Sequence, residues 1–182
     1  MGYNSRIMNA LVGIIMGSDS DLTVMQAAAD VLEKEFGIAS SVTALSAHRA
    51  PEAVAEYAKT AHEKGIKVII AGAGVAAHLP GVIAAFTPVP VIGVPIKSSG
   101  AAVIDSLFAI AQMPPGVPVA TVAIGGAKNA GILAAEIIGA GDEAVRQKVI
   151  DYKKKMEKDV LAKAEKIEER GFKVYMEENG LI

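Results

Sequence analysis

The stretch LVGIIMGSDSD, from Leu11 to Asp21, decides the fold of this chain. Its first six residues would be apolar on both faces of an extended chain, which is typical of a strand buried on both sides of a parallel sheet. The glycine, serines and aspartates that follow are typical of a loop that opens a helix. The stretch therefore predicts a strand that passes through a polar loop into a covering helix.

The same alternation of strand and helix continues along the chain. Further strands are predicted over Ser40–Leu45, Val68–Ala71, Val89–Pro95 and Val117–Ile124, and helices over Leu22–Glu35, Pro51–Lys64, Leu79–Phe86, Ala101–Ala111 and Lys128–Ile138. Ser40–Leu45 alternates more clearly and is expected nearer an edge of the sheet. Since crossovers between parallel strands are right-handed, we predict an α/β protein, a three-layer αβα sandwich with a parallel, flavodoxin-like five-stranded sheet.

The composition changes beyond Asp142, where charged residues dominate. Apolar residues recur at intervals of three and four from Val145 to Ile167, which predicts one long amphipathic helix over about 142–170 that ends at Gly171. A helix of about thirty residues is about 45 Å long. It packs on its own domain or forms an arm that contacts a neighbouring subunit, and its length favours the arm. We expect a single domain over 1–182, with a core over about 8–140 and residues 1–7 as a loose extension.

Composition and charge narrow the classes of function. A net charge of −2 provides no field that would attract nucleic acid. The absence of cysteine excludes disulfides, thiolate metal sites and a cysteine nucleophile. The apolar run Met8–Gly17 is too short to span a membrane. We therefore expect a cytoplasmic protein without nucleic-acid or membrane partners.

Polar residues follow each predicted strand. The loops are GSDSD (17–21), SAHRA (46–50), GAGVAAHLPG (72–81), PIKSSG (95–100) and GGAKNAG (125–131). Ligands of open parallel sheets bind beyond the carboxyl ends of the strands, so these loops predict a binding site along one rim.

The residue types in these loops favour a phosphorylated ligand. The hydroxyls of Ser18 and Ser20 and the free amides of a helix start suit a phosphate, and Asp21 can accept hydrogen bonds from a sugar. Alternatively, Ser20 or Asp21 only caps the helix. Arg49 suits a phosphate or a surface ion pair, and His48 can carry a proton near neutral pH.

The remaining basic residues leave alternatives open. His78 either donates to a carboxylate or holds its loop, and Lys97 and Lys128 either meet an anion or cap elements. His62 is expected on a solvated face. Since no histidines have the spacing of metal ligands, we expect no metal. These residues predict a phosphosugar or mononucleotide site with an acid/base histidine.

Six motifs in order then carry a resemblance to a known family. They are MGSDSD, SAHRA, AGAGVAAHLPG, PVIGVPIKSS, DSLFAIAQMPPGVPVATVAI and AKNAGILAA. Together they resemble the PurE family of purine biosynthesis over roughly Val12 to Tyr175. Class I members isomerise N5-carboxyaminoimidazole ribonucleotide (N5-CAIR) to 4-carboxy-5-aminoimidazole ribonucleotide (CAIR), whereas class II members carboxylate aminoimidazole ribonucleotide (AIR) with CO2. The loop AGAGVAAHLPG resembles class I.

The resemblance implies roles for individual residues. It implies that His48 is the proton carrier and that Arg49 meets the phosphate. The other substrate-binding residues that it implies are Ser18, Ser20, Asp21, Ser46, Ala47, Gly72, Ala73, Gly74, His78 and Leu79. It also implies a reaction without an organic cofactor, because the aminoimidazole is itself an enamine-like nucleophile, and a homo-octamer in which C-terminal helices reach across subunits.

The chain departs from the family pattern at three places. Ala50 stands where the family usually has threonine, Val75 stands where it usually has glycine, and SSGAAVID precedes a segment that usually contains leucine and glycine. A β-branched valine is strained wherever a positive φ is required. A direct AIR carboxylase and a repurposed nucleotide-binding homologue therefore remain as alternatives to the mutase.

Overall fold

The computed structural model describes residues 10–97 and 103–182 of the chain. In this part, five parallel strands form one sheet in the order β2-β1-β3-β4-β5. The strands are β1 (Val12–Met16), β2 (Ser40–Ala44), β3 (Val68–Ala73), β4 (Val91–Pro95) and β5 (Ala120–Thr121). This order is that of the flavodoxin-like doubly wound sheet, so the predicted fold class is confirmed.

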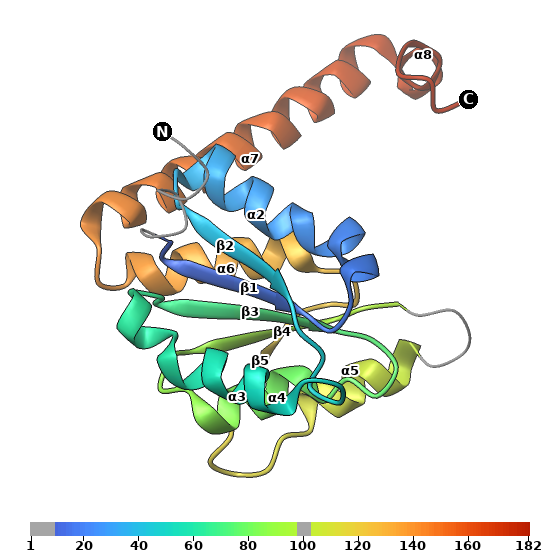
Figure 1. Cartoon of the computed structure of the whole chain (residues 1–182). Helices are drawn as coiled ribbons and strands as arrows, with labels where there is room; N and C mark the ends of the chain where they lie inside the picture. The colour runs from blue at the N-terminus through green and yellow to red at the C-terminus, as the bar shows by residue number, and fades with distance from the viewer. Residues whose placement is uncertain (1–9, 98–102) are drawn as a thin grey trace.

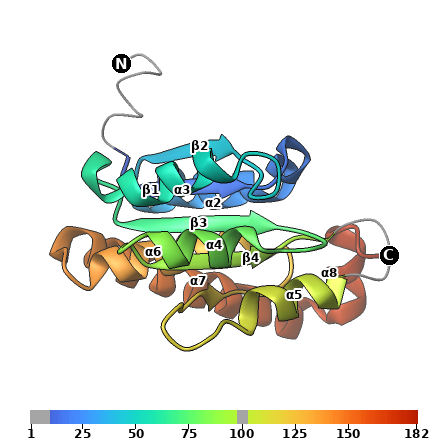
Figure 2. The same ribbon diagram turned by 60° about the horizontal axis from the view of Figure 1, so that its bottom comes forward.

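Helices cover both faces of the sheet (Figures 1 and 2). One face carries α2 (Leu22–Phe36), α6 (Ala127–Gly139) and the beginning of α7 (Glu143–Arg170). The other face carries α3 (Pro51–Thr60), α4 (Leu79–Phe86) and α5 (Val103–Ala111). The 3-10 turns η1 (Asp19–Asp21) and η2 (His62–Lys64) and the terminal helix α8 (Phe172–Glu178) complete the described elements.

Successive side chains of β1 enter two separate cores. Val12, Ile14 and Met16 join the core beneath α2 and α6, whereas Ile15 joins the core beneath α3 and α4. All of these side chains are buried, because each face of a parallel sheet is covered by helices. Gly13 makes room on the α3 side, since a Cβ atom at this position would overlap the hydroxyl of Tyr57.

Several predicted boundaries differ from those in the structure. The fifth strand is limited to Ala120–Thr121 instead of Val117–Ile124, because only these residues pair with β4. The predicted helix over Pro51–Lys64 divides into α3 and η2. The edge position of β2 is as predicted. The loose extension over 1–7 and the start of the helix at Ala101 lie outside the described residues.

Helix α7 begins against α2 and α6 and then projects away from them. Val145, Val149 and Tyr152 are buried, and the rings of Tyr152 and Phe36 meet edge to face with centroids 5.3 Å apart. Farther along, Val160 and Leu161 are 65% and 62% exposed, and the helix projects beyond the sheet to α8 (Figure 1). Within the described ranges, no helix is both long and apolar enough to cross a membrane.

Candidate functional site

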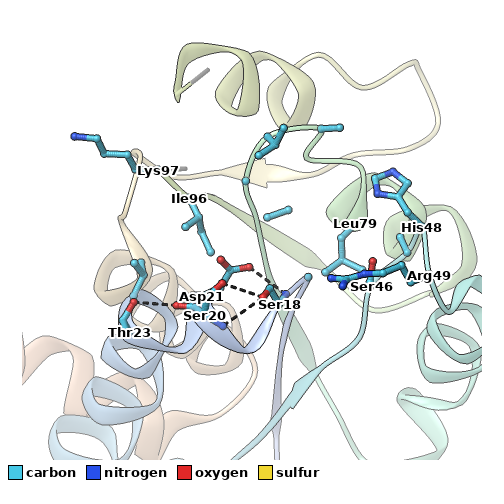
Figure 3. A pocket seen from close by; sticks show the side chains of 17 residues that line it. Ser18, Ser20, Asp21, Thr23, Ser46, His48, Arg49, Leu79, Ile96 and Lys97 are labelled. Carbon is cyan, nitrogen blue, oxygen red and sulfur yellow. Dashed lines mark hydrogen bonds between the residues drawn. The ribbon is translucent and has the colours of Figure 1, made fainter. Parts of the chain in front are cut away.

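A pocket of about 520 Å³ lies at the carboxyl ends of β1 and β3. The chain adds β2 on one side of β1 and then adds β3, β4 and β5 on the other side. The order in which strands are added therefore changes direction between β1 and β3. Crevices at such a reversal are the usual ligand sites of doubly wound sheets. The pocket therefore lies at the predicted rim, and the loops after β1, β2, β3 and β4 line it (Figure 3).

The first loop forms a polar wall through a capping box. Ser18 is the N-cap of η1, where its hydroxyl accepts from the Ser20 amide, while the Asp21 carboxylate accepts from the Ser18 amide at 3.2 Å. The Ser20 hydroxyl donates to the Ser18 oxygen at 2.9 Å. Ser18 is thus the N-cap of η1 and Asp21 completes its capping box, whereas Asp21 stands at the N-cap position of α2 without a side-chain capping bond to that helix. All three side chains also line the pocket, so capping leaves them available to a ligand.

Asp21 is the acidic residue in this wall whose pKa is shifted from its ordinary value. Burial raises the pKa of its carboxyl above the ordinary value of 3.8, the hydrogen bond from the Ser18 amide lowers this pKa, and the negative charge of Asp19 raises it. Since burial is the largest of these effects, the carboxylate is held here at a cost in solvation. A ligand that donates hydrogen bonds to it would offset that cost.

The second loop provides a cation on the opposite side of the pocket (Figure 3). Arg49 is exposed, and none of the described carboxylates lies within ion-pair distance of its guanidinium. The surface ion pair considered for Arg49 is therefore not formed. Lys97 also lines the pocket, but its side chain extends outward from the rim in Figure 3. An unpaired guanidinium facing a helix start is suited to a phosphate group.

His48 is joined to His78 across the pocket rim. Nε2 of His48 lies 2.9 Å from Nδ1 of His78, and the rings are nearly perpendicular, with an interplanar angle of 76°. One of these nitrogens must donate and the other must accept. The bond therefore couples the tautomers of two residues that lie thirty positions apart in the sequence.

The third loop provides an apolar wall. Ala73, Gly74, Val75 and Ala76 line the pocket together with Leu79 at the start of α4. Val75 has φ +53°, and it is the one residue other than glycine with positive φ in the described part of the chain. The strain expected for a valine at this position is therefore present.

Most of the predicted site residues line this pocket. They are Ser18, Ser20, Asp21, Ser46, Ala47, His48, Arg49, Ala73, Gly74 and Leu79. His78 is not a lining residue and reaches the site through His48. Gly72 lies beneath the pocket, where a Cβ atom would overlap the Met25 and Ile96 side chains, so its part in the site is to permit close packing.

Six lining residues were not predicted as binding residues: Gly17, Thr23, Val24, Val75, Ala76 and Ile96. Thr23 and Val24 lie in the first turn of α2, three residues after Ser20 and Asp21. This spacing places them on the same side of the helix start, and it is the signal that could have identified them. Lys128 and His62 are not among the lining residues. In the part of the chain that the structure describes, no three His, Cys, Asp or Glu side chains gather as a metal site requires.

Comparisons with known proteins find relatives that match most of this chain. An N5-carboxyaminoimidazole ribonucleotide mutase from Thermotoga maritima is 60% identical over 165 residues, which are 91% of this chain and 96% of that protein. The phosphoribosylaminoimidazole carboxylase of Saccharomyces cerevisiae is 54% identical over 171 residues, which are 94% of this chain but 30% of that protein. The crystal structure of Treponema denticola PurE matches with a TM-score of 0.75 and 30% identity, covering 88% of this chain and 98% of that chain.

The family assignment rests on most of the sequence. Residues 11–159, which include every strand and each loop that lines the pocket, match the AIR carboxylase family. The chain therefore belongs to the AIR carboxylase, or PurE, family.

Proposed function

We propose that this protein is an N5-CAIR mutase, an isomerase that converts N5-CAIR to CAIR in the purine (IMP) pathway. The observation that carries the proposal is the pocket that places the His48 imidazole beside an unpaired Arg49 guanidinium and opposite the capping box of η1. The 60% identity to a protein named as this mutase supports it. The carboxylase-named relative supports the alternative less well, because this chain corresponds to under a third of its length.

We assign the polar wall and Arg49 to the ribose phosphate. The guanidinium of Arg49 and the Ser18 and Ser20 hydroxyls would bind the phosphate, and the Asp21 carboxylate would accept from the ribose hydroxyls. Ser46 and Ala47 would position the substrate along the second loop. The aminoimidazole would then lie against Ala73, Gly74 and Leu79, beside His48.

The proposed reaction has two steps that balance overall. Cleavage of the N5–carboxylate bond, with uptake of one proton by the nitrogen, releases CO2 and leaves AIR. C4 of the aminoimidazole then forms a bond with the retained CO2 and loses its proton, which restores the proton count. His48 would move the C4 proton as general acid and base, and retention of CO2 beside C4 is a proximity effect. The enamine-like ring supplies the electron pair, so the proposal includes no metal or organic cofactor.

His78 would position His48 in the substrate-free protein. Their 2.9 Å contact occupies Nε2 of His48, so this nitrogen becomes available when the imidazoles separate. We propose that the substrate carboxylate replaces His48 as a partner of His78 when the ligand binds.

We also propose that the protein acts as a cytoplasmic homo-octamer, with residues 8–140 as the catalytic core and 142–170 as an arm. The exposed apolar side chains of α7 and α8, among them Val160, Leu161 and Phe172, support an assembly in which neighbouring subunits cover them.

The experiment that tests this function follows CAIR formation by ultraviolet absorbance. Fresh N5-CAIR is supplied in bicarbonate-depleted buffer, and a parallel sample receives AIR with high bicarbonate. We expect turnover from N5-CAIR alone, whereas turnover of AIR alone would identify a direct carboxylase. Turnover of neither by a folded protein would support the repurposed homologue.

Substitution of His48 tests the assignment of the proton carrier. His48→Asn should reduce turnover by about 10²–10⁴-fold, the usual contribution of a general acid–base group. His62→Asn is the matched control and should retain activity, since His62 lies in η2 outside the pocket lining. An active, folded His48→Asn protein would contradict the assignment.

A further inference from the structure

Lys97 lines the pocket, but the proposed reaction gives it no role. It lies shortly after the end of β4, and its side chain extends outward from the rim, away from the pocket interior (Figure 3). It is exposed, and none of the described carboxylates lies within ion-pair distance of its ammonium group. The positive charge of Lys97 is therefore available to ligands that approach the pocket from solvent.

Other charges of the protein oppose the approach of an anion to this pocket. The whole chain has a net charge of −2, and the first loop carries the carboxylates of Asp19 and Asp21. A ribonucleotide with one phosphate and one carboxylate carries about three negative charges, about two of them on the phosphate. Ligand and protein thus have net charges of the same sign. A cation at the mouth of the pocket reduces this repulsion where the ligand enters.

We infer that Lys97 is a steering residue, whose ammonium group attracts the anionic substrate to the pocket and does not contact it once it is bound. This inference rests on the proposed mutase function, which determines the charge of the ligand. A charge acts over about a Debye length, about 8 Å at physiological ionic strength, so it needs no directed hydrogen bond. The attraction increases with the charge of the ligand. Lys97 therefore favours the carboxylated ribonucleotides over AIR, which lacks the carboxylate.

A series of substitutions at position 97 isolates the effect of the charge. Lys97→Gln removes the charge, Lys97→Glu reverses it and Lys97→Arg retains it. Lys67→Gln is the matched control, because it makes the same change in net charge just before β3, at the end of the strand opposite the pocket. Both lysines are exposed, and neither forms an ion pair with a described residue, so all of these variants are expected to fold.

The first measurement is kcat/KM for N5-CAIR over a range of ionic strength. At low ionic strength, Lys97→Gln should lower kcat/KM by about threefold to tenfold, the size expected for one charge that acts on about three across about 10 Å of water. Lys97→Glu should lower it further, whereas Lys97→Arg and Lys67→Gln should change it little. The value of kcat should stay the same in every variant. At about 1 M salt, where the Debye length is about 3 Å, the values of kcat/KM should converge.

The second measurement is the binding of CAIR and of AIR by calorimetry, which requires no turnover. At low salt, Lys97→Gln should weaken the binding of CAIR more than that of AIR, because CAIR carries one more negative charge. At high salt it should weaken neither. A protein that shows this pattern of binding but does not turn over N5-CAIR would contradict the mutase function and still support steering by Lys97.

Three results would overturn the inference. A loss of kcat/KM in Lys97→Gln that persists at about 1 M salt would show that the ammonium group contacts the bound ligand, since close contacts are screened less than distant ones. Equal losses in Lys97→Gln and Lys67→Gln would show that net charge matters and position does not. Unchanged kcat/KM and unchanged CAIR affinity in Lys97→Glu at low salt would show that the charge at position 97 has no effect on the ligand.

Discussion

The Asp21 carboxyl is partly buried, and burial of its charged form lowers the free energy of unfolding. This effect can be measured because it depends on pH. Because its pKa is raised in the folded protein, the folded state binds a proton more firmly than the unfolded state between pH 3.8 and the raised pKa. The contribution of Asp21 to the free energy of unfolding therefore decreases as pH rises through this window.

Replacement of Asp21 should remove that cost. Asp21→Asn keeps an oxygen that can accept from the Ser18 amide, so the variant should be more stable than the unchanged protein above the window and gain little at or below pH 3.8. Urea unfolding at a series of pH values measures the difference. Asp19→Asn, which removes the neighbouring charge, should shift the upper end of the window to lower pH. A difference that is constant with pH would contradict this account.

Individual site residues could be predicted from the sequence where they follow a predicted strand. Ser18, Asp21, His48 and Arg49 follow strands directly, so strand prediction alone places them on the rim. The contact between His48 and His78 could not be predicted from residue types, since it depends on how two separate loops fold toward each other. The positive φ of Val75 runs against the preference of valine, so only the family pattern pointed to it.

Helix α3 begins without a side-chain cap, which makes its start a place to add stability. Ala50 is the N-cap with φ −142°, its methyl side chain cannot accept a hydrogen bond from an amide of the first turn, and Pro51 follows as the first helical residue. Ala50→Thr should raise the free energy of unfolding by about 0.5–2 kcal/mol, because its hydroxyl can accept from a free amide of the first turn. Urea denaturation checks this. Ala50→Val has a similar shape without the hydroxyl and should give no such gain.

The contact between β1 and α3 depends on Gly13, because the side chain of Tyr57 packs directly over it. Burial raises the pKa of Tyr57 to about 12. Its buried hydroxyl has no hydrogen bond of good geometry in the described part of the chain, although Ser41 is close enough to lower that pKa in part. Gly13→Ala should lower the free energy of unfolding by about 1–3 kcal/mol, because the added methyl group overlaps this hydroxyl.

A second substitution tests the cause. In a Tyr57→Phe background the same Gly13→Ala change should cost clearly less, because the overlapping oxygen is gone. The four proteins form a double-mutant cycle measured by urea unfolding. Equal costs of Gly13→Ala in both backgrounds would show that the tyrosine hydroxyl is not what limits space there.

The strands and helices were predictable in kind and order, but less so in length. Strands buried on both faces carry apolar runs, and these identified β1, β3 and β4 closely. The run over Val117–Ile124 has a similar composition, yet only Ala120 and Thr121 pair with β4, at Ile92 and Gly93, although β4 itself continues to Pro95. Helix α8 was not predicted, since the glycine at 171 is typical of the end of a helix and not of a junction between two.

The exposed half of α7 makes the assembly of the whole protein testable. Val160→Glu combined with Leu161→Glu should dissociate an octamer, because the two side chains are mostly exposed in the single subunit and would be charged inside an interface. Light scattering in solution measures the mass. Lys158→Ala with Lys163→Ala changes the net charge by the same amount on the same exposed stretch and should leave assembly intact. Equal masses for the two double variants would contradict a role for the apolar residues.

The position of β1 inside the sheet, between β2 and β3, also affects how the chain folds as it leaves the ribosome. One edge of β1 pairs with β2, but its other edge stays open until residues 68–73 have been synthesised. The apolar face of α2 stays open longer, since it packs against α6 and, through Phe36, against Tyr152 of α7. Open strand edges and uncovered apolar faces make nascent chains prone to aggregate. Each growing chain therefore presents surfaces that chaperones bind until its last quarter emerges.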